Sequence, residues 1–244
     1  MFTYILVSLL LLGLSTILIL VFQPRWVFSI VNKMIPGAIY FAETSKLIVA
    51  LTIDDGPDAI TTPKILEVLQ SYEARATFFL ISNRVKDNES VVAEIVANKN
   101  ELGNHLTEDK PSIKLSPQEF ESDLLEANIS LSRFAKPYWL RPASGLYNTT
   151  MVETAQKYGY HIVLGSLFPF DTHIHSSWFA SKHILFNVRP GSIIVLHDGG
   201  SRGRRTALTL ETILPELNRR GYRVVTLSEL FREVKDFVNH ASAR

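Results

Sequence analysis

The chain contains no cysteine among its 244 residues, which excludes a disulfide framework and any thiolate chemistry. It also lacks an excess of charge of one sign, because 25 basic and 24 acidic side chains leave a formal net charge of +1. Such a balance gives no basic surface for nucleic acid and no polybasic membrane patch. Apolar residues make up 46% of the chain, enough for one sizeable domain with a full core.

Charged side chains are also missing from residues 2–22, a run dominated by Leu, Ile and Val. About 20 such residues can cross a bilayer as a helix. No Lys or Arg precedes the run and no small-x-small cleavage site follows Phe22, so an anchor is favoured over a removed signal peptide. We therefore predict a transmembrane anchor or signal segment at residues 1–23 and a juxtamembrane connector at residues 24–44.

Beyond the connector, short apolar runs typical of strands alternate with helical patterns. Ser116 and Glu119 form a capping-box pattern before one of these helices, and another helix is expected over residues 206–220. Such alternation predicts a mostly parallel sheet with helices outside, either open or closed into a barrel. The expected organisation is one α/β domain over residues 45–235 and a C-terminal tail at residues 236–244.

Two adjacent carboxylates, Asp54 and Asp55, follow the first strand-like run, and Gly56-Pro57 supplies a turn. On a regular strand the two side chains would point to opposite faces, but a bend at the strand end lets both reach one cavity. One can then bind a metal while the other acts as a base. The alternative is a turn-rich loop without chemistry.

A possible set of metal ligands follows, because His105 and Asp109 lie four residues apart. On a helical turn they would share one face, within reach of one cation. With Asp55 they offer one nitrogen and two oxygen ligands, which suit Zn²⁺ but also Co²⁺ or Mn²⁺. The alternative for Asp109 is a surface carboxylate beside Lys110.

Further polar residues end or follow apolar runs later in the chain. Arg141 can pair with a free carboxylate and fix its orientation and pKa, although it is also read as an ordinary surface arginine. Gly145 permits a tight backbone path, so a main-chain N–H near Ser144 could face a developing oxyanion. His197 is a candidate general acid or a capping histidine, and Leu196 could line a small apolar pocket.

Together these short motifs resemble those of the polysaccharide deacetylase family with the NodB-type homology domain, carbohydrate esterase family 4. The resemblance covers about residues 45–232. It rests on five motifs in order: Thr52-Ile53-Asp54-Asp55-Gly56-Pro57, Gly103-Asn104-His105, Arg141-Pro142-Ala143-Ser144-Gly145, a loose fourth motif from Asp171 to Trp178, and Ile194-Val195-Leu196-His197-Asp198.

The resemblance implies a distorted (β/α) barrel and a divalent metal, often zinc. It also implies hydrolysis of an N-acetyl group on an amino sugar of a chitin-like or cell-wall glycan. The implied roles are a general base for Asp54, metal ligands for Asp55 and His105, a general acid for His197, tuning residues for Arg141 and Asp171, and substrate contacts for Ser144, Gly145, Trp178 and Leu196.

The chain departs from the family pattern at several places. Asp109 stands where a second histidine is usual, and Ala143-Ser144 replaces a pair that commonly supplies an aromatic wall. These changes keep two alternatives open: an amidase acting on a non-sugar or cyclic amide, and a catalytically silent glycan-binding protein.

The expected location of the domain rests on two opposing signals. Arg25 and Lys33 after the apolar run favour a cytoplasmic domain by the positive-inside rule. The family resemblance implies work on wall or envelope sugars, so we predict an extracytoplasmic or lumenal domain, secreted if the first segment is cleaved. The expected partners are an N-acetylated glycan and the membrane, with no nucleic acid; the sequence leaves the oligomeric state open.

Overall fold

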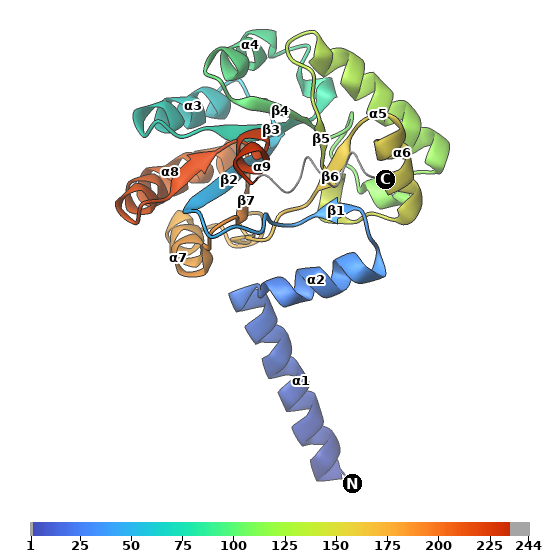
Figure 1. Ribbon diagram of the computed structural model, residues 1–244, viewed down its shortest axis with the longest axis vertical. Coiled ribbons are helices and arrows are strands. Elements are labelled where there is room, and N and C mark those ends of the chain that lie inside the picture. Colours follow the sequence, from blue (N-terminus) through green and yellow to red (C-terminus); the bar gives the residue numbers. More distant parts are fainter. Residues whose placement is uncertain (1, 235–244) are drawn as a thin grey trace.

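The structure is a computed structural model, and it describes residues 2–234. A long helix, α1 (Phe2–Phe22), projects from a globular body, and α2 (Arg25–Met34) lies at the base of that body (Figure 1). The tail predicted at residues 236–244 lies outside the described residues.

The body is built on a curled parallel sheet. Within the described residues the strand order is β1-β6-β5-β4-β3-β2-β7, and β8 pairs with the first half of β2. Beyond β6, Leu167 makes an isolated parallel bridge with Ile194 of β7, which draws the two ends of the sheet together. This half-barrel with outer helices agrees with the (β/α) fold expected from the sequence. The strands are β1 (Ala38–Ile39), β2 (Ile48–Gly56), β3 (Ala76–Leu80), β4 (Glu101–Asn104), β5 (Trp139–Leu140), β6 (His161–Val163), β7 (Ile193–His197) and β8 (Arg223–Val225).

Helices cover the outside of the sheet, as Figure 1 shows. The predicted capping box at Ser116 and Glu119 is confirmed at the start of α5. One helix differs from expectation, because α8 begins at Gly200 and not near residue 206. The helices of the body are α3 (Thr61–Ser71), α4 (Glu89–Ala97), α5 (Pro117–Ser132), α6 (Thr149–Lys157), α7 (Ser177–Asn187), α8 (Gly200–Arg219) and α9 (Leu227–Glu233).

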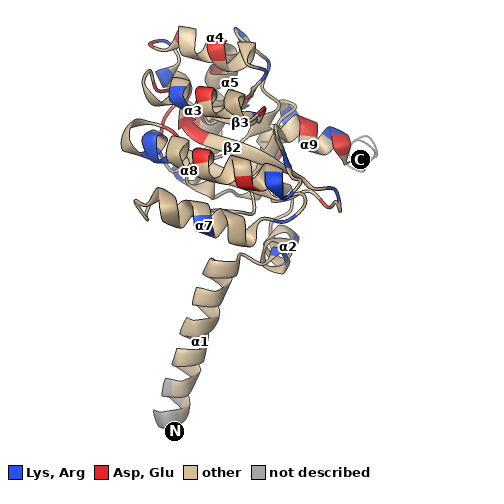
Figure 2. Cartoon of the chain, turned by 90° about the vertical axis from the view of Figure 1, so that its left-hand side faces the viewer, with Lys and Arg blue, Asp and Glu red and all other residues tan. Residues whose placement is uncertain are grey.

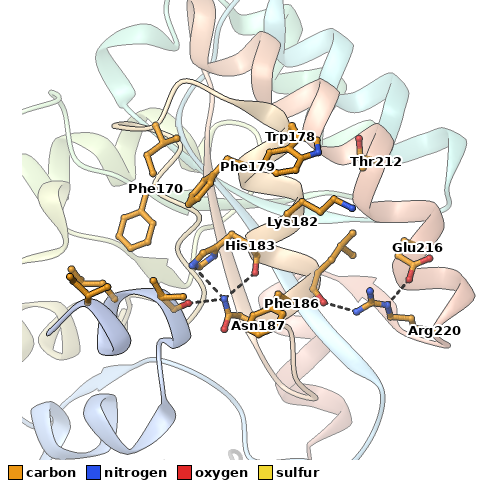
Figure 3. Close-up of a pocket in the computed structure, with 15 residues that line it drawn as sticks. Phe170, Trp178, Phe179, Lys182, His183, Phe186, Asn187, Thr212, Glu216 and Arg220 are labelled. Carbon is orange, nitrogen blue, oxygen red and sulfur yellow. Dashed lines mark hydrogen bonds and ion pairs between the residues drawn. The ribbon is translucent and has the colours of Figure 1, made fainter. Parts of the chain in front are cut away.

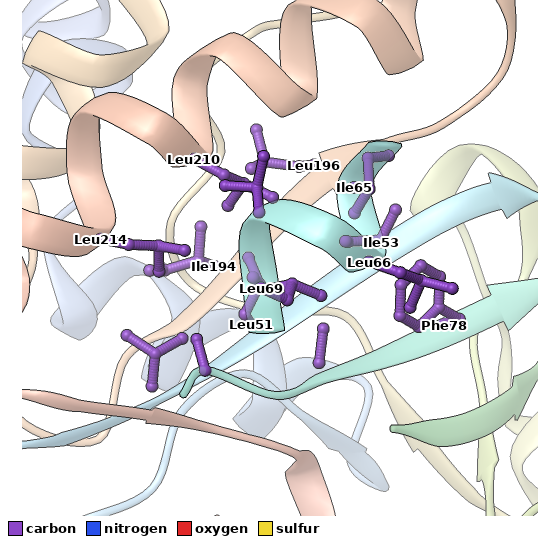
Figure 4. Close-up of a cluster of buried hydrophobic side chains, with 14 of the residues drawn as sticks. Leu51, Ile53, Ile65, Leu66, Leu69, Phe78, Ile194, Leu196, Leu210 and Leu214 are labelled. Atoms are coloured by element: carbon purple, nitrogen blue, oxygen red, sulfur yellow. The ribbon is translucent and has the colours of Figure 1, made fainter. Parts of the chain in front are cut away.

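The main core lies between the central strands and the helices α3 and α8. Every position of β2 is buried, as expected for a parallel strand covered on both faces. Leu51, Ile53 and Leu196 of β2 and β7 pack against Ile65 of α3 and Leu210 of α8 (Figure 4). Each such side chain contributes about 1.5–3 kcal/mol on burial, so this core fixes the strand ends that carry the polar residues.

The N-terminal segment differs from the simple anchor and connector that the sequence suggested. Figure 2 shows that α1 carries no acidic or basic side chain. Among the described residues no single helix meets the length and hydropathy criteria for a membrane span, although the pair Val7–Phe22 and Arg25–Met34, bent by 100°, meets them together. The sheet also begins before residue 45, since β1 pairs with β6. Two residues of strand are too short a pattern to recognise in a sequence.

Candidate active site

A pocket of about 670 Å³ lies at the carboxyl ends of the central strands. In a sheet of parallel strands these ends meet at one rim, where polar side chains from distant segments gather. The structure brings eight of the predicted site residues to this pocket: Asp54, Asp55, His105, Asp109, Arg141, Ser144, Gly145 and His197.

The end of β2 is bent so that both neighbouring carboxylates reach the pocket. The register with β3 shifts between Asp54 and Gly56, and Asp55 has a φ of +68°. Both aspartates are only 3% exposed. The irregular backbone at Asp55 therefore removes the strict alternation of a strand.

Arg141 holds Asp54 in a buried ion pair. Its Nη1 lies 2.6 Å from Asp54 Oδ1 and donates to Thr52 Oγ1 at 2.7 Å, while its Nε donates to the carbonyl oxygen of Val163 at 3.0 Å. The guanidinium also lies over the ring of Phe79, 4.2 Å from the centroid. Burial lowers the pKa of Arg141, and the Asp54 carboxylate opposes that shift. Asp54 is thus fixed with one oxygen paired.

His105 faces Asp55 across the pocket floor. Its Nδ1 donates to the carbonyl oxygen of Arg141 at 2.5 Å, because a carbonyl can only accept, and its Nε2 lies 3.4 Å from Asp55 Oδ1. Burial alone would lower the pKa of His105, but the hydrogen bond to Asp55 and both aspartate charges raise it. Burial would likewise raise the pKa of Asp55, but His105, His197 and Arg202 bring it down to about 2. A hydrogen bond from Nδ1 to a main-chain carbonyl is the kind that orients a metal-ligating histidine, and it leaves Nε2 as the atom that could bind an ion.

His197, at the end of the neighbouring strand β7, forms a second charged pair. Its Nδ1 lies 3.0 Å from Asp171 Oδ1, and its main-chain N–H donates to Asp171 Oδ2 at 3.0 Å. Burial would lower the pKa of His197, but Asp171, with help from Asp54 and Asp55, raises it to about 9. The imidazole therefore carries a proton at neutral pH. Register pairing of His197 with Asp54 on neighbouring strands places the two groups on the same rim.

Asp109 is less well placed than the sequence suggested. The residues after His105 form a loop in which Leu106 has a φ of +63°, so the helical turn expected between His105 and Asp109 is wrong. The side chain of Asp109 is half exposed, and its Oδ2 lies 3.9 Å from Arg84 Nη2. Asp109 lines the pocket without joining Asp55 and His105.

Only some of the residues predicted to contact the substrate line this pocket. Ser144 and Gly145 line the pocket, but the N–H of Gly145 donates to the carbonyl oxygen of Pro142 and is therefore already engaged. Leu196 is fully buried in the core, and Val195, which points to the other face of β7, lines the pocket in its place. Trp178 is 69% exposed on α7 and lines a different cavity.

That second cavity, of about 1010 Å³, lies between the end of α1 and the helices α7 and α8 (Figure 3). Its walls are mainly aliphatic and aromatic. Asn187 of α7 donates to the carbonyl oxygen of Val21 at 2.9 Å, and the ring of Phe186 lies 5.8 Å from that of Phe22. These contacts join α1 to the body. Asp54 and Asp55 do not line this second cavity, because they lie in the pocket at the carboxyl ends of the strands.

Two arginines beside Asp55 were not predicted from the sequence. Arg202 of α8 places Nη1 2.9 Å from Asp55 Oδ2, and Arg84 donates to the main-chain oxygen of Asp55. The available signal was the basic run at Arg202, Arg204 and Arg205, which begins five residues after His197. The helix was expected only from residue 206, which left Arg202 outside it, whereas α8 begins at Gly200.

An apolar wall of the pocket also went unrecognised. Val27, Phe28 and Val31 of α2 line it, together with Tyr40 and Phe168. Phe28 stacks on Tyr40 with ring centroids 5.3 Å apart. The segment expected to be a connector thus forms part of the site and supplies aromatic surface where Ala143-Ser144 supplies none.

Two residues of the pocket, Asp55 and His105, have the donor atoms that a divalent cation needs. Asp55 and His105 present an oxygen and a nitrogen 3.4 Å apart in a buried position. Within residues 2–234 no group of three His, Cys, Asp or Glu side chains is arranged to hold a metal ion. A bound ion would therefore take its other ligands from water or substrate, or from a rearranged Asp109.

Comparisons with known proteins agree with the fold. The family model for polysaccharide deacetylase matches residues 42–163. A peptidoglycan-N-acetylglucosamine deacetylase of Bacillus cereus is 38% identical over 188 residues, covering 76% of this chain and 88% of the relative. The crystal structure of the Bc1960 peptidoglycan N-acetylglucosamine deacetylase superposes with a TM-score of 0.76 at 30% identity, covering 80% of this chain and 92% of that one. A family 4 acetyl xylan esterase from Clostridium thermocellum, solved with a cobalt ion, gives a TM-score of 0.71 at 30% identity, covering 76% and 90%.

Proposed function

The chain belongs to the polysaccharide deacetylase family, and from this we propose that it hydrolyses N-acetyl groups on the amino sugars of a cell-wall or chitin-like glycan. The observation that carries the proposal is the pairing of a buried carboxylate, Asp54 with Arg141, and a protonated imidazole, His197 with Asp171, at one pocket. Amide hydrolysis needs such a base and such an acid.

Asp54 is proposed as the general base. Arg141 holds one of its oxygens and leaves the other able to accept a proton from water as that water attacks the acetyl carbonyl carbon. Arg141 is buried beside Asp54, so the ion pair holds the carboxylate in a fixed orientation before the substrate arrives.

His197 is proposed as the general acid. The departing nitrogen of the amino sugar must gain a proton when the carbon–nitrogen bond breaks. His197 is protonated at neutral pH and is held by Asp171 through Nδ1, which leaves Nε2–H to be donated. After this step the products are acetate and the free amine.

Asp55 and His105 are the proposed ligands of a divalent cation, Zn²⁺ or alternatively Co²⁺ or Mn²⁺. Such an ion supplies Lewis-acid polarisation of the acetyl carbonyl and makes a nearby water more acidic. Asp109 stays a predicted third ligand, which would have to leave Arg84 to reach the ion.

The proposed activity is tested by measuring acetate release from N-acetylglucosamine oligomers by the full chain with added Co²⁺, Zn²⁺ or a chelator. We expect release that depends on the metal. Ring opening of a cyclic imide without acetate release would favour the amidase alternative. Glycan binding without either product would favour a silent glycan-binding protein.

We also propose that the protein is attached to a membrane through α1, with its body on the extracytoplasmic or lumenal side. Apolar side chains extend from α1 onto neighbouring helices: Trp26, Ile30 and Met34 recur at four-residue spacing on the exposed face of α2, and Trp178 and Phe186 are exposed on α7. Tryptophan is enriched where a protein meets the membrane–water interface.

Protease treatment of intact cells and of sealed inverted vesicles tests the attachment and its orientation. The proposal expects the body to sediment with membranes and to be cleaved in intact cells. Cleavage only from the cytoplasmic side would reject the orientation, and a body recovered entirely in the soluble fraction would reject the attachment.

A further inference from the structure

Arg202 neutralises the carboxylate that would bind the metal. Its Nη1 lies 2.9 Å from Asp55 Oδ2, while His105 Nε2 approaches Oδ1 of the same group at 3.4 Å. Asp55 is 3% exposed, so its negative charge has little solvent to screen it. A guanidinium and a divalent cation are alternative partners for such a buried carboxylate, because both stabilise its ionised form.

The start of α8 is built to bring Arg202 to this position. The next residue, Gly203, packs so closely that a Cβ there would lie 2.3 Å from Asp198 Oδ1 and 2.4 Å from Thr61 Oγ1. Asp198 accepts hydrogen bonds from Thr61 Oγ1 at 2.6 Å and from the N–H of Gly199 at 2.7 Å. The first turn of α8 is therefore fixed against Asp198, just after β7, and against Thr61 at the start of α3, and Arg202 leaves this turn beside Asp55.

A second arginine restrains the other predicted carboxylate ligand. Arg84 donates to the main-chain oxygen of Asp55 and lies 3.9 Å from Asp109. Both oxygen ligands expected from the sequence are thus paired with guanidinium groups. The Arg202–Asp55 pair is the stronger of the two. Its carboxylate is buried and its arginine side chain is 31% exposed, whereas the carboxylate of the Arg84–Asp109 pair is half exposed.

We propose that Arg202 competes with the divalent cation for Asp55 and sets the metal affinity of the site. Metal binding then requires the Arg202 side chain to move from Asp55 into the solvent that already reaches it. The site consequently binds a divalent ion more weakly than Asp55 and His105 alone would allow. The proposal rests on the proposed function only in placing the ion at these two residues.

Calorimetric titration of Co²⁺ into the full chain in detergent tests the competition. We expect Arg202→Ala to bind Co²⁺ about tenfold or more tightly than the wild type, the scale by which residues around a metal site change its affinity. Arg204→Ala is the matched control, because Arg204 is an exposed arginine of the same helix turn with no ion pair in the described residues. It should leave the affinity unchanged.

Further variants guard against a change in folding and identify the ligands. If Arg202→Ala does not fold, judged by circular dichroism, Arg202→Gln removes the charge while keeping a long polar side chain. Adding His105→Ala to Arg202→Ala should abolish the gain in affinity. Equal or weaker binding by both charge-removing variants, or a gain that survives His105→Ala, would overturn the proposal.

The outcome is separable from that of the deacetylase proposal, because metal affinity is measured without turnover. A tighter Arg202→Ala protein that releases no acetate would count against the deacetylase and leave the competition standing. If the protein releases acetate but its Co²⁺ affinity is the same with and without Arg202, the deacetylase proposal stands and the competition is rejected.

Discussion

Arg141 and Asp54 form an ion pair that is buried on both sides. Arg141 is 3% exposed, and its Nη2 is buried without a hydrogen-bond partner among the described residues. Removing one member of a buried ion pair leaves the other charge uncompensated, at a cost of about 3–5 kcal/mol. We expect Arg141→Met to lower the free energy of unfolding by that amount, measured by urea denaturation at pH 7. Arg133→Met, at an exposed pair with Glu89, is the control and should change it by less than about 1 kcal/mol.

The His197–Asp171 pair predicts a pH dependence of stability. The pKa of His197 rises from 6.5 to about 9 in the folded chain, so the folded state binds the proton more tightly than the unfolded state. The stabilisation is therefore fully present below about pH 6.5 and is lost as the pH rises through 9. Urea denaturation from pH 6 to 10 should show a loss of about 3 kcal/mol, because each unit of pKa difference corresponds to about 1.4 kcal/mol.

Asp171→Asn supplies the control for this pH dependence, because the amide cannot hold the imidazolium by charge. The variant should lose most of the decline between pH 7 and 10, and the pKa of His197, followed by NMR, should fall toward 6.5. A decline that persists unchanged in the variant would show that another group carries it.

At the scale of elements, the first turn of α8 depends on the absence of a side chain at Gly203. A Cβ there would meet Asp198 and Thr61 at less than 2.5 Å, and both belong to a short hydrogen-bonded group that cannot move aside freely. Overpacking of this kind costs about 1–3 kcal/mol. We expect Gly203→Ala to lower the thermal unfolding midpoint, whereas Ser201→Ala, on the exposed side of the same turn, should not. Equal midpoints for the two variants would contradict the close packing.

The elements also show what the sequence can and cannot predict. Periodicity and capping identified most strands and the start of α5, because a capping box and a buried apolar run are local signals. The start of α8 was missed, since glycine-rich residues disfavour a helix unless tertiary contacts such as those of Asp198 hold them. The loop after His105 was mistaken for a helical turn because a spacing of four says nothing about the positive φ of Leu106.

The candidate site was foreseen in its residue types and only partly in its geometry. The charges that gather at one rim follow from the parallel order of the strands, so Asp54, Arg141 and His197 could be placed together from sequence. Which face of β7 meets the pocket depends on register, and for that reason Leu196 was expected where Val195 lies. The pairing of Arg202 with Asp55 depends on the path of α8, which no local pattern encodes.

At the scale of the whole molecule, the N-terminal segment is part of the folded body. β1 pairs with β6, Tyr40 is 8% exposed and shares a hydrogen bond of 3.1 Å with Tyr147, and Phe28 of α2 forms a wall of the pocket. We expect a protein that starts at residue 45 to be less stable than one that starts at residue 24 by at least about 2 kcal/mol, from the apolar surface left uncovered. Comparing their urea midpoints in the same detergent tests this, and equal midpoints would make residues 24–44 a mere connector.

The central claim is that Asp54 is the base of an amide hydrolysis that releases acetate. The most direct measurement is the initial rate of acetate release from N-acetylglucosamine oligomers by the full chain, its Asp54→Asn variant and the control Asp87→Asn, an exposed aspartate that is not among the residues lining the pocket. The account predicts that Asp54→Asn slows release about 100-fold or more, the usual contribution of a general base, while Asp87→Asn keeps the wild-type rate. Release at the wild-type rate by a folded Asp54→Asn protein would contradict it.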